Sequence, residues 1–284
     1  MTSCGSTRRC TRMQFGRTVA SILTLVRWEN ALLSVAGVVL GAWWATGRPN
    51  EPETIVMAGV AILLTAFANA DNDVRDYEID RVAHPERPLP AGRLSIEAAR
   101  IVVGISAAAA LVLASLLGGA QTLAAVGVIA VMTLYNRGVK AHGVPGNVVV
   151  AVVASLPFLF GAWSAGSPSA GIPLFLVGVP LHFAREIAKD IDDADGDAAH
   201  RRTLPLRVGA GRARLVVVSS VALFVAALAP FAVRRPAFAI VVLPAVALCL
   251  VAARRVLSGR RGTPRLLKSA MVVAMVAFVL SARW

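Results

Sequence analysis

The chain has 284 residues, of which 57% are hydrophobic and only 16% are charged, and this excludes an ordinary soluble domain. Its formal net charge of +13 does not indicate a nucleic-acid-binding protein, because the basic residues lie in loops between apolar runs, without interleaved aromatic side chains. The three cysteines, Cys4, Cys10 and Cys249, are odd in number and lack metal-ligand spacing, so neither a disulfide framework nor a zinc site is predicted.

The apolar runs predict membrane-spanning helices. Residues 1–19 are polar and basic without the apolar core of a signal peptide, and we predict that they form a disordered cytoplasmic tail. Nine apolar segments follow in residues 20–284, each long enough to cross a membrane as a helix. They are residues 20–45, 54–72, 97–117, 119–136, 145–164, 171–190, 213–233, 236–253 and 266–282. The predicted fold class is therefore all-α, a polytopic membrane protein with nine transmembrane helices.

The distribution of Lys and Arg predicts how the chain is oriented. With the N-terminus inside the cell, all of these residues except Arg48, Arg234, Arg235 and Arg283 lie on the cytoplasmic side. Cytoplasmic loops of membrane proteins carry such an excess of basic residues. We therefore expect a cytoplasmic N-terminus, an external C-terminus, and cytoplasmic positions for the two long loops after the second and sixth segments.

An acidic cluster lies at the end of the second apolar segment. If this stretch is helical, Asn72, Asp76 and Asp80 recur at four-residue intervals on one face, with Asp73 beside them. Carboxylate and carboxamide oxygens suit Mg²⁺, which commonly binds one or two carboxylates together with phosphate oxygens of a substrate. The pattern favours a metal and phosphate site over the alternative, a solvated acidic helix end.

A second acidic cluster begins the loop after the sixth segment. Asp190, Asp193 and Asp197 share one helical face by their spacing, and Arg185 and Lys189 precede them as i, i+4 neighbours. Two acidic faces on one side of the membrane can hold Mg²⁺ ions between them and clamp a diphosphate, with Arg and Lys as further donors. The alternative is a charged loop that only solvates itself.

These motifs resemble the signatures of the UbiA superfamily of intramembrane prenyltransferases, over about residues 20–284. Residues 72–80 with the Arg-Pro-Leu-Pro-Ala-Gly-Arg run at 87–93 resemble the first signature, and residues 185–197 resemble the second. The stretch from Arg27 to Asn30 resembles an N-terminal Arg-Pro-x-Asn element in which Trp28 replaces the proline. Four further stretches are most similar to the geranylgeranylglycerol-phosphate geranylgeranyltransferases: Asp76–Arg81, Gly146–Asn147, Leu156–Gly161 and Lys189–Asp193.

The resemblance implies nine helices around a central cavity that opens to lipid and is capped by cytoplasmic loops. It also implies a Mg²⁺-dependent transfer of an isoprenyl group from a prenyl diphosphate to a lipophilic acceptor, with release of pyrophosphate. A glycerol-phosphate lipid and an aromatic acceptor both remain open. The alternative is an intramembrane terpene cyclase that acts on the prenyl diphosphate alone. Neither nucleic acid nor a protein partner is implied.

The family motifs, carried over onto this sequence, imply three sets of site residues. The implied metal ligands are Asn72, Asp73, Asp76, Asp80, Asp190, Asp193 and Asp197. The residues implied to contact the diphosphate are Arg27, Asn30, Arg137, Lys140, Arg185 and Lys189. The residues implied in catalysis are Asp76, Asp80, Tyr135, Lys140 and Asp193, and Tyr135 is alternatively an anchor at the membrane interface. For His182, inside the sixth segment, a core or cavity-lining role is favoured over proton transfer.

Overall fold

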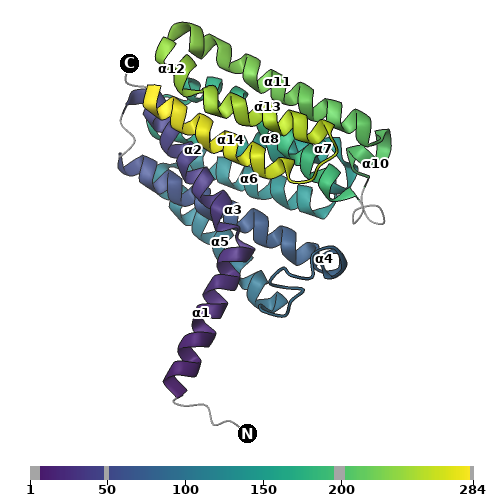
Figure 1. The fold of residues 1–284 in the computed structure, drawn as a ribbon. Coiled ribbons are helices and arrows are strands. Elements are labelled where there is room, and N and C mark those ends of the chain that lie inside the picture. The colour runs from purple at the N-terminus through teal and green to yellow at the C-terminus, as the bar shows by residue number, and fades with distance from the viewer. Residues whose placement is uncertain (1–6, 48–50, 195–201, 282–284) are drawn as a thin grey trace.

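Residues 7–47, 51–194 and 202–281 are described by a computed structural model, and in these ranges the chain is helical and contains no strand (Figure 1). The described residues contain eight helices that are long and apolar enough to cross a membrane. A ninth span is formed if the bent pair of helices at residues 16–25 and 28–46 crosses the membrane as one unit. The predicted fold class, an all-α polytopic membrane protein, is therefore confirmed, and the predicted number of helices agrees with the structure to within this bent pair.

The long helices coincide with the predicted apolar segments. They are α2 (Trp28–Thr46), α3 (Pro52–Arg75), α5 (Ile96–Leu117), α6 (Gly119–Arg137), α7 (Val144–Ser164), α8 (Ile172–Asp192), α11 (Ala210–Arg234), α13 (Leu243–Leu257) and α14 (Thr263–Ser281). Short helices connect them: α4 (Tyr77–Ala83), η1 (Val139–His142), η2 (Pro168–Gly171), α10 (Leu204–Val208) and α12 (Pro236–Val241). Helices α12 and α13 together form one span.

The first predicted segment, residues 20–45, is bent. Helix α1 (Thr7–Leu25) and helix α2 meet at an angle of 58°. Arg27 lies at the break with φ 51° and ψ 61°, and it is the one non-glycine residue with a positive φ in the described ranges. A left-handed conformation costs free energy for a residue with a Cβ, so other contacts must hold Arg27 in place. Those contacts belong to the site described below.

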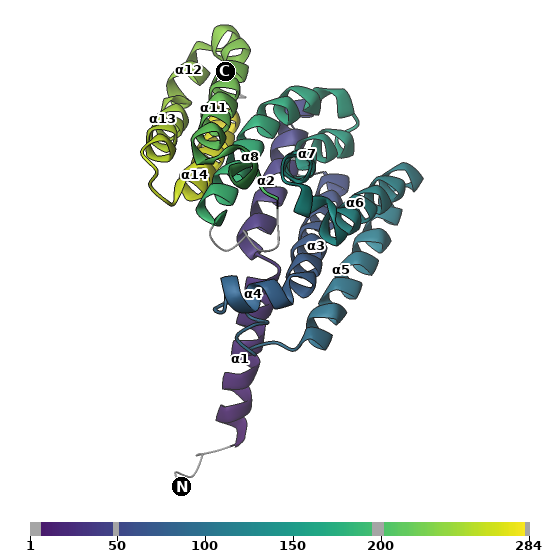
Figure 2. The same cartoon turned by 90° about the vertical axis from the view of Figure 1, so that its right-hand side faces the viewer.

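The N-terminal stretch is helical where the sequence predicts a disordered tail. Residues 7–19 lie in α1, which projects away from the bundle in both views (Figures 1 and 2). Polarity argues against a packed core in this stretch, but it does not prevent a helix, because the segment contains no proline. The domain boundary at residue 20 stays a prediction.

The remaining helices form two groups that α7 joins. Helices α2, α3, α5 and α6 share one hydrophobic core, which includes Val38 and Phe67. Helices α8, α11, α13 and α14 share the other, which includes Phe224 and Phe278. Helix α7 packs against both α2 and α8, and Figure 2 shows α5 and α6 on the opposite side of the bundle from α12 and α13. The site lies between the two groups.

Glycine lets α2 and α7 cross in close contact. A Cβ at Gly161 would collide with the backbone carbonyl of Val38, and a Cβ at Gly41 would collide with that of Phe158. Small residues commonly permit such approaches between membrane helices. We therefore expect Gly161→Ala to lower the free energy of unfolding by about 1–3 kcal/mol, the usual cost of overpacking.

Thermal unfolding of the purified protein in detergent would measure this loss. Gly127→Ala in α6 is the matched control, because a Cβ at Gly127 would meet nothing within 4 Å. Alanine is the better helix former, so the control variant should unfold at the wild-type temperature or slightly above it. Equal destabilisation by the two substitutions would contradict the close approach of α2 and α7.

Candidate functional site

A cavity of about 690 Å³ lies between the two helix groups. Its charged lining residues come from the C-terminal parts of α3 and α8, from α4 and the loop after it, and from the N-terminal ends of α2 and α14, so they gather at one end of the bundle. Deeper turns of these helices, with α6, α7 and α11, supply apolar walls that include Leu64, Phe158, Phe224 and Phe278. The cavity can thus hold a molecule with a polar head and a long apolar tail.

The first acidic cluster is buried at the junction of α3 and α4. Asp73, Asp76 and Asp80 are 4%, 2% and 3% exposed, respectively. The predicted helix is interrupted at Asp76, where α3 ends and α4 begins, but backbone hydrogen bonds from Asp76 to Asn72 and from Asp80 to Asp76 keep the four-residue register. Asn72, Asp76 and Asp80 consequently all line the cavity, one on each of three successive turns.

Lys140 neutralises the most deeply buried of these carboxylates. Its Nζ donates to Asp76 Oδ1 at 2.5 Å and to Asn72 Oδ1 at 3.4 Å. Lys140 lies in η1, between α6 and α7, so this contact brings a distant loop against the acidic cluster. Burying an unpaired carboxylate costs several kcal/mol, roughly, and the ion pair offsets that cost.

Two arginines complete the neutralisation of the acidic cluster. Arg27 donates to Asp73 Oδ1 at 2.9 Å and to Asn69 Oδ1 at 3.3 Å, which explains why its unusual backbone conformation persists. Arg87 donates to Asp80 Oδ2 at 2.6 Å and lies 3.7 Å from Asp73 Oδ1. Both arginines line the cavity, so a phosphate group that entered it would compete with the aspartate carboxylates for these two cations.

The environment of Asp80 disfavours its ionised form. Burial raises the pKa of the Asp80 carboxyl above its usual range, and the charge of Arg87 and its hydrogen bond oppose that rise. The negative charges of Asp73 and Asp76 raise the pKa further. A cation placed beside Asp80 would therefore favour its ionised form.

The second acidic cluster contributes to the other side of the same cavity. Asp193, which caps the end of α8, lines the cavity together with Arg185 and Lys189. Asp190 instead accepts a hydrogen bond from Asn147 Nδ2 at 2.7 Å. Asp192 accepts one from the Gly262 backbone N–H at 2.8 Å, which fixes the loop before α14.

The structure does not bring every predicted residue to the cavity. Asn30, Tyr135 and His182 line it, whereas Arg137 is exposed at the end of α6 and is not part of the lining. Asp197, a predicted metal ligand, lies outside the described residues. Asp73 and Lys140 contact lining residues without belonging to the lining themselves, and Asp190 is directed to Asn147.

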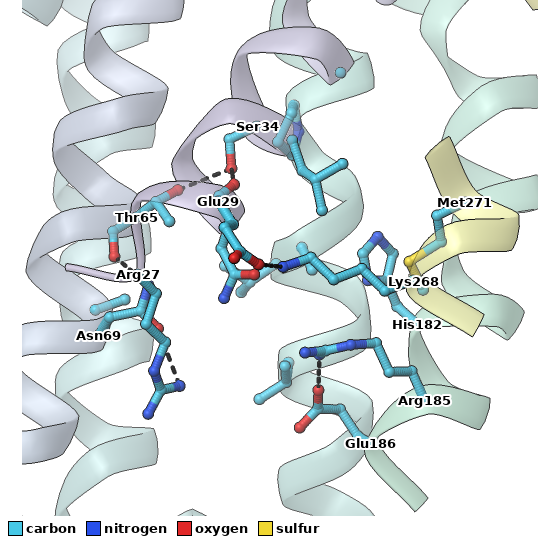
Figure 3. Close-up of a pocket in the computed structure, with 18 of the residues that line it drawn as sticks. Arg27, Glu29, Ser34, Thr65, Asn69, His182, Arg185, Glu186, Lys268 and Met271 are labelled. Carbon is cyan, nitrogen blue, oxygen red and sulfur yellow. Dashed lines mark hydrogen bonds and ion pairs between the residues drawn. The ribbon is translucent and has the colours of Figure 1, made fainter. Parts of the chain in front are cut away.

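Other polar residues of the site were not predicted from the sequence. Asp71 accepts from Arg75 Nε at 2.9 Å and from Asn136 Nδ2 at 2.8 Å, which ties α6 to α3 beside the acidic cluster. The i, i+4 spacing signals the Arg75 contact, but nothing local signals the one with Asn136. Glu29 and Lys268 also pair, at 2.7 Å, although 239 positions separate them (Figure 3).

The donor chemistry fits a Mg²⁺ ion. Asn72, Asp76, Asp80 and Asp193 are oxygen donors that line one cavity. Within the described ranges, no three His, Cys, Asp or Glu residues already converge so as to hold a metal ion. Mg²⁺ usually keeps bound water and takes one or two carboxylates plus substrate phosphate oxygens, so a complete protein cage is not required. The arrangement suits a metal that enters with a phosphorylated ligand.

Comparison of the amino-acid sequence with known proteins shows which family the chain matches. A model of the UbiA prenyltransferase family matches residues 34–280, which is most of the chain. A curated relative from Halobacterium salinarum, digeranylgeranylglyceryl phosphate synthase, is 35% identical over 277 residues, covering 94% of this chain and 98% of the relative.

Solved structures share the fold. A structure of a digeranylgeranylglyceryl phosphate synthase matches with a TM-score of 0.71 and 25% identity, covering 93% of this chain and 98% of that one. A UbiA homologue from Archaeoglobus fulgidus, bound to GPP and Mg²⁺, matches with a TM-score of 0.72 and 20% identity over 92% of this chain and 98% of the other. The helical architecture around the cavity is therefore one that known membrane proteins adopt.

Proposed function

Because the chain belongs to the UbiA prenyltransferase family and is thus an intramembrane prenyl-transferring enzyme, we propose that its acceptor is a glycerol-phosphate lipid. The proposed prenyl donor is geranylgeranyl diphosphate. The observation that carries the proposal is that buried carboxylates with exchangeable Lys and Arg partners sit at the polar end of an apolar-walled cavity. The polar end of such a cavity matches the diphosphate group of a prenyl diphosphate, and the apolar walls match its prenyl chain.

The choice of acceptor is supported by the curated relatives. The Halobacterium salinarum protein and one from Methanopyrus kandleri, 32% identical over 91% of this chain, both carry the name digeranylgeranylglyceryl phosphate synthase. That name describes a glyceryl phosphate with two geranylgeranyl groups. The proposed substrate is accordingly a glyceryl phosphate that already carries one such group and presents a free hydroxyl.

We assign the diphosphate to the α3 side of the cavity. Lys140, Arg27 and Arg87 would exchange part of their carboxylate contacts for diphosphate oxygens, which charge-assisted hydrogen bonds favour. Arg185, Lys189 and Asn30 also line the cavity and stay predicted diphosphate contacts, whereas exposed Arg137 is left out of the proposal.

A bound metal ion would be held by Asn72, Asp76, Asp80 and Asp193, with Asp73 and Asp190 behind them. Mg²⁺ at this position would supply positive charge that neutralises the diphosphate as it leaves. Asp197 remains a predicted further ligand.

The reaction proposed is an exchange of one C–O bond for another. The bond between the allylic carbon and the diphosphate breaks, with the electron pair leaving on pyrophosphate, while the Lys140 and Arg87 cations stabilise the developing charge. The acceptor hydroxyl oxygen forms the new ether bond, and its proton passes to an oxygen of the departing diphosphate. Apolar walls around Phe158 and Phe224 exclude water that would otherwise quench the allylic cation, and the Tyr135 ring can stabilise it.

We further propose that the polar end of the cavity faces the cytoplasm, with the N-terminus inside and the C-terminus outside. The excess of Lys and Arg in the loops at that end supports this orientation. Prenyl diphosphates are charged and water-soluble at one end, so access from the aqueous cytoplasm suits the donor.

The proposed function is tested with purified protein and radiolabelled geranylgeranyl diphosphate. We expect pyrophosphate release to require Mg²⁺ and geranylgeranylglyceryl phosphate together, and to stop when a chelator removes the metal. Pyrophosphate release with a cyclic hydrocarbon product and no acceptor would instead identify a terpene cyclase. Transfer only to an aromatic acceptor would overturn the glycerol-phosphate assignment.

The raised pKa of Asp80 predicts how metal-dependent activity responds to acid. A protonated carboxyl is a poor metal ligand, so Mg²⁺-dependent activity should fall on acidification at a higher pH than an ordinary Asp would give. Arg87→Gln removes the group that holds this pKa down, and the acid limb should then move to still higher pH. The pH at which activity falls is obtained from rates measured against pH at limiting Mg²⁺. A fall at lower pH in Arg87→Gln than in the wild type would contradict the role of Asp80 as a metal ligand.

A further inference from the structure

A second charged pair crosses the cavity away from the acidic cluster. Lys268, in the second turn of α14, donates to Glu29 Oε2 in the first turn of α2 at 2.7 Å. Both residues line the cavity, and Figure 3 shows their side chains meeting across it. The proposed diphosphate contacts Arg27, Arg87 and Lys140 are engaged with the acidic cluster, so Lys268 is a cation separate from that set.

Stabilisation of the fold does not account for this pair. The Glu29 side chain is 62% exposed and the Lys268 side chain is 26% exposed, and ion pairs this open to solvent contribute about 0–1 kcal/mol. Helices α2 and α14 are already joined by apolar contacts, including an edge-on ring contact between Trp44 and Phe278 with centroids 5.8 Å apart. The ion pair between Glu29 and Lys268 therefore contributes little to holding α2 against α14.

The chemistry of the substrates calls for a second cationic position. Prenyl diphosphate and a glyceryl phosphate acceptor are both anionic, so bringing their reacting atoms together forces two phosphate groups close to each other. Like charges at short range repel strongly in a cavity of low polarity, and each phosphate needs its own cation. The α3 side and the end of α8 supply cations for the diphosphate, which leaves Lys268 of α14 to match the acceptor phosphate.

We propose that Lys268 binds the phosphate of the acceptor and that the Glu29 carboxylate occupies this position until the acceptor arrives. This inference rests on the proposed function, because it assumes an acceptor with a phosphomonoester group. Such a group carries about two negative charges at neutral pH, so it competes well with a single carboxylate that is largely exposed. Arg185 also extends into the cavity, but Glu186 holds it at 2.6 Å within the same helix.

Lys268 would also act as a specificity-determining residue. In a glyceryl phosphate the reacting hydroxyl lies on the carbon next to the one that bears the phosphate. Anchoring the phosphate therefore fixes where the hydroxyl can be, and the apolar walls only need to accept the lipid chain. A lipid alcohol without phosphate lacks this anchor.

The test uses the full-length protein in detergent and compares Lys268→Gln with Glu29→Gln. Equilibrium binding of geranylgeranylglyceryl phosphate is measured without prenyl diphosphate, and the KM for each substrate is measured during turnover. Lys268→Gln should weaken acceptor binding about ten- to a hundredfold, the range for a lost hydrogen bond to a charged group. Glu29→Gln should strengthen it, because the competing carboxylate is gone. The KM for the prenyl diphosphate should change in neither variant.

The opposite signs separate this proposal from a structural tether. If the pair only ties α2 to α14, both substitutions weaken acceptor binding equally, and that result would overturn the assignment. Lys268→Arg, which keeps the charge, should bind the acceptor better than Lys268→Gln, and geranylgeranylglycerol without phosphate should bind all variants alike. Wild-type protein that makes no product from this lipid would contradict the proposed function, whereas product formation with same-direction changes would contradict only the role of Lys268.

Discussion

Asp76→Asn and Asp193→Asn should each lower the rate of Mg²⁺-dependent prenyl transfer, measured per folded protein, by about a thousandfold. Asp76 lies at the end of α3 and Asp193 at the end of α8, so the two residues line the same cavity from different helices. Asparagine keeps the shape of each side chain and removes the negative charge that a metal ion needs. The loss should therefore appear in kcat and in the Mg²⁺ concentration for half-maximal rate.

Glu78→Gln is the matched control for these variants. Glu78 lies two residues from Asp76, but its side chain is 76% exposed and pairs with Arg81 at the surface. Its substitution should leave transfer at the wild-type rate. Full retention of Mg²⁺-dependent pyrophosphate release in Asp76→Asn and Asp193→Asn would rule out the catalytic role of the two acidic clusters.

Lys140→Met should lower kcat by about a hundred- to a thousandfold, because it removes a cation that we propose stabilises the leaving diphosphate. It should also destabilise the protein. The Asp76 carboxylate is almost fully buried and would lose its partner at 2.5 Å, and breaking a buried pair in this way costs about 3–5 kcal/mol. Steady-state rates and thermal unfolding in detergent measure the two effects on the same preparation.

The double variant Lys140→Met/Asp76→Asn tests whether the unpaired carboxylate causes the loss of stability. With the carboxylate also neutralised, most of the lost stability should return, whereas the transfer rate should remain low. Arg81→Gln is the control for removing a basic residue, since the Arg81 side chain is exposed and its partner Glu78 is exposed too. A double variant as unstable as Lys140→Met alone would mean that the unpaired Asp76 carboxylate is not the cause of the lost stability.

The spans were predictable from the sequence because hydropathy and helix length act locally. Eight of the nine apolar runs begin and end within a few residues of an observed span, and the first run is divided between α1 and α2. The break at Arg27 was not predictable. No glycine or proline marks it, and what holds the left-handed conformation is a pair of contacts to Asn69 and Asp73 on another helix.

The site was predictable in its motifs but not in its pairings. Regular spacing placed Asn72, Asp76 and Asp80 together, since four-residue repeats share a helix face even across the short interruption at Asp76. The contact between Lys268 and Glu29 joins opposite ends of the chain, and spacing carries no information about it. Arg137 was carried over from the family motifs, but it is exposed at the end of α6 and does not line the cavity.

The most direct test of the account is to follow the oxygen atoms in the transfer reaction. Geranylgeranylglyceryl phosphate labelled with ¹⁸O at its free hydroxyl is incubated with the protein, geranylgeranyl diphosphate and Mg²⁺. The mass of the lipid product is then measured by mass spectrometry. The account predicts a digeranylgeranyl ether lipid that retains the label, formed in equal amount to the pyrophosphate released. Pyrophosphate released in excess, with an unlabelled geranylgeranyl alcohol or a cyclic hydrocarbon as the product, would contradict transfer to the acceptor hydroxyl.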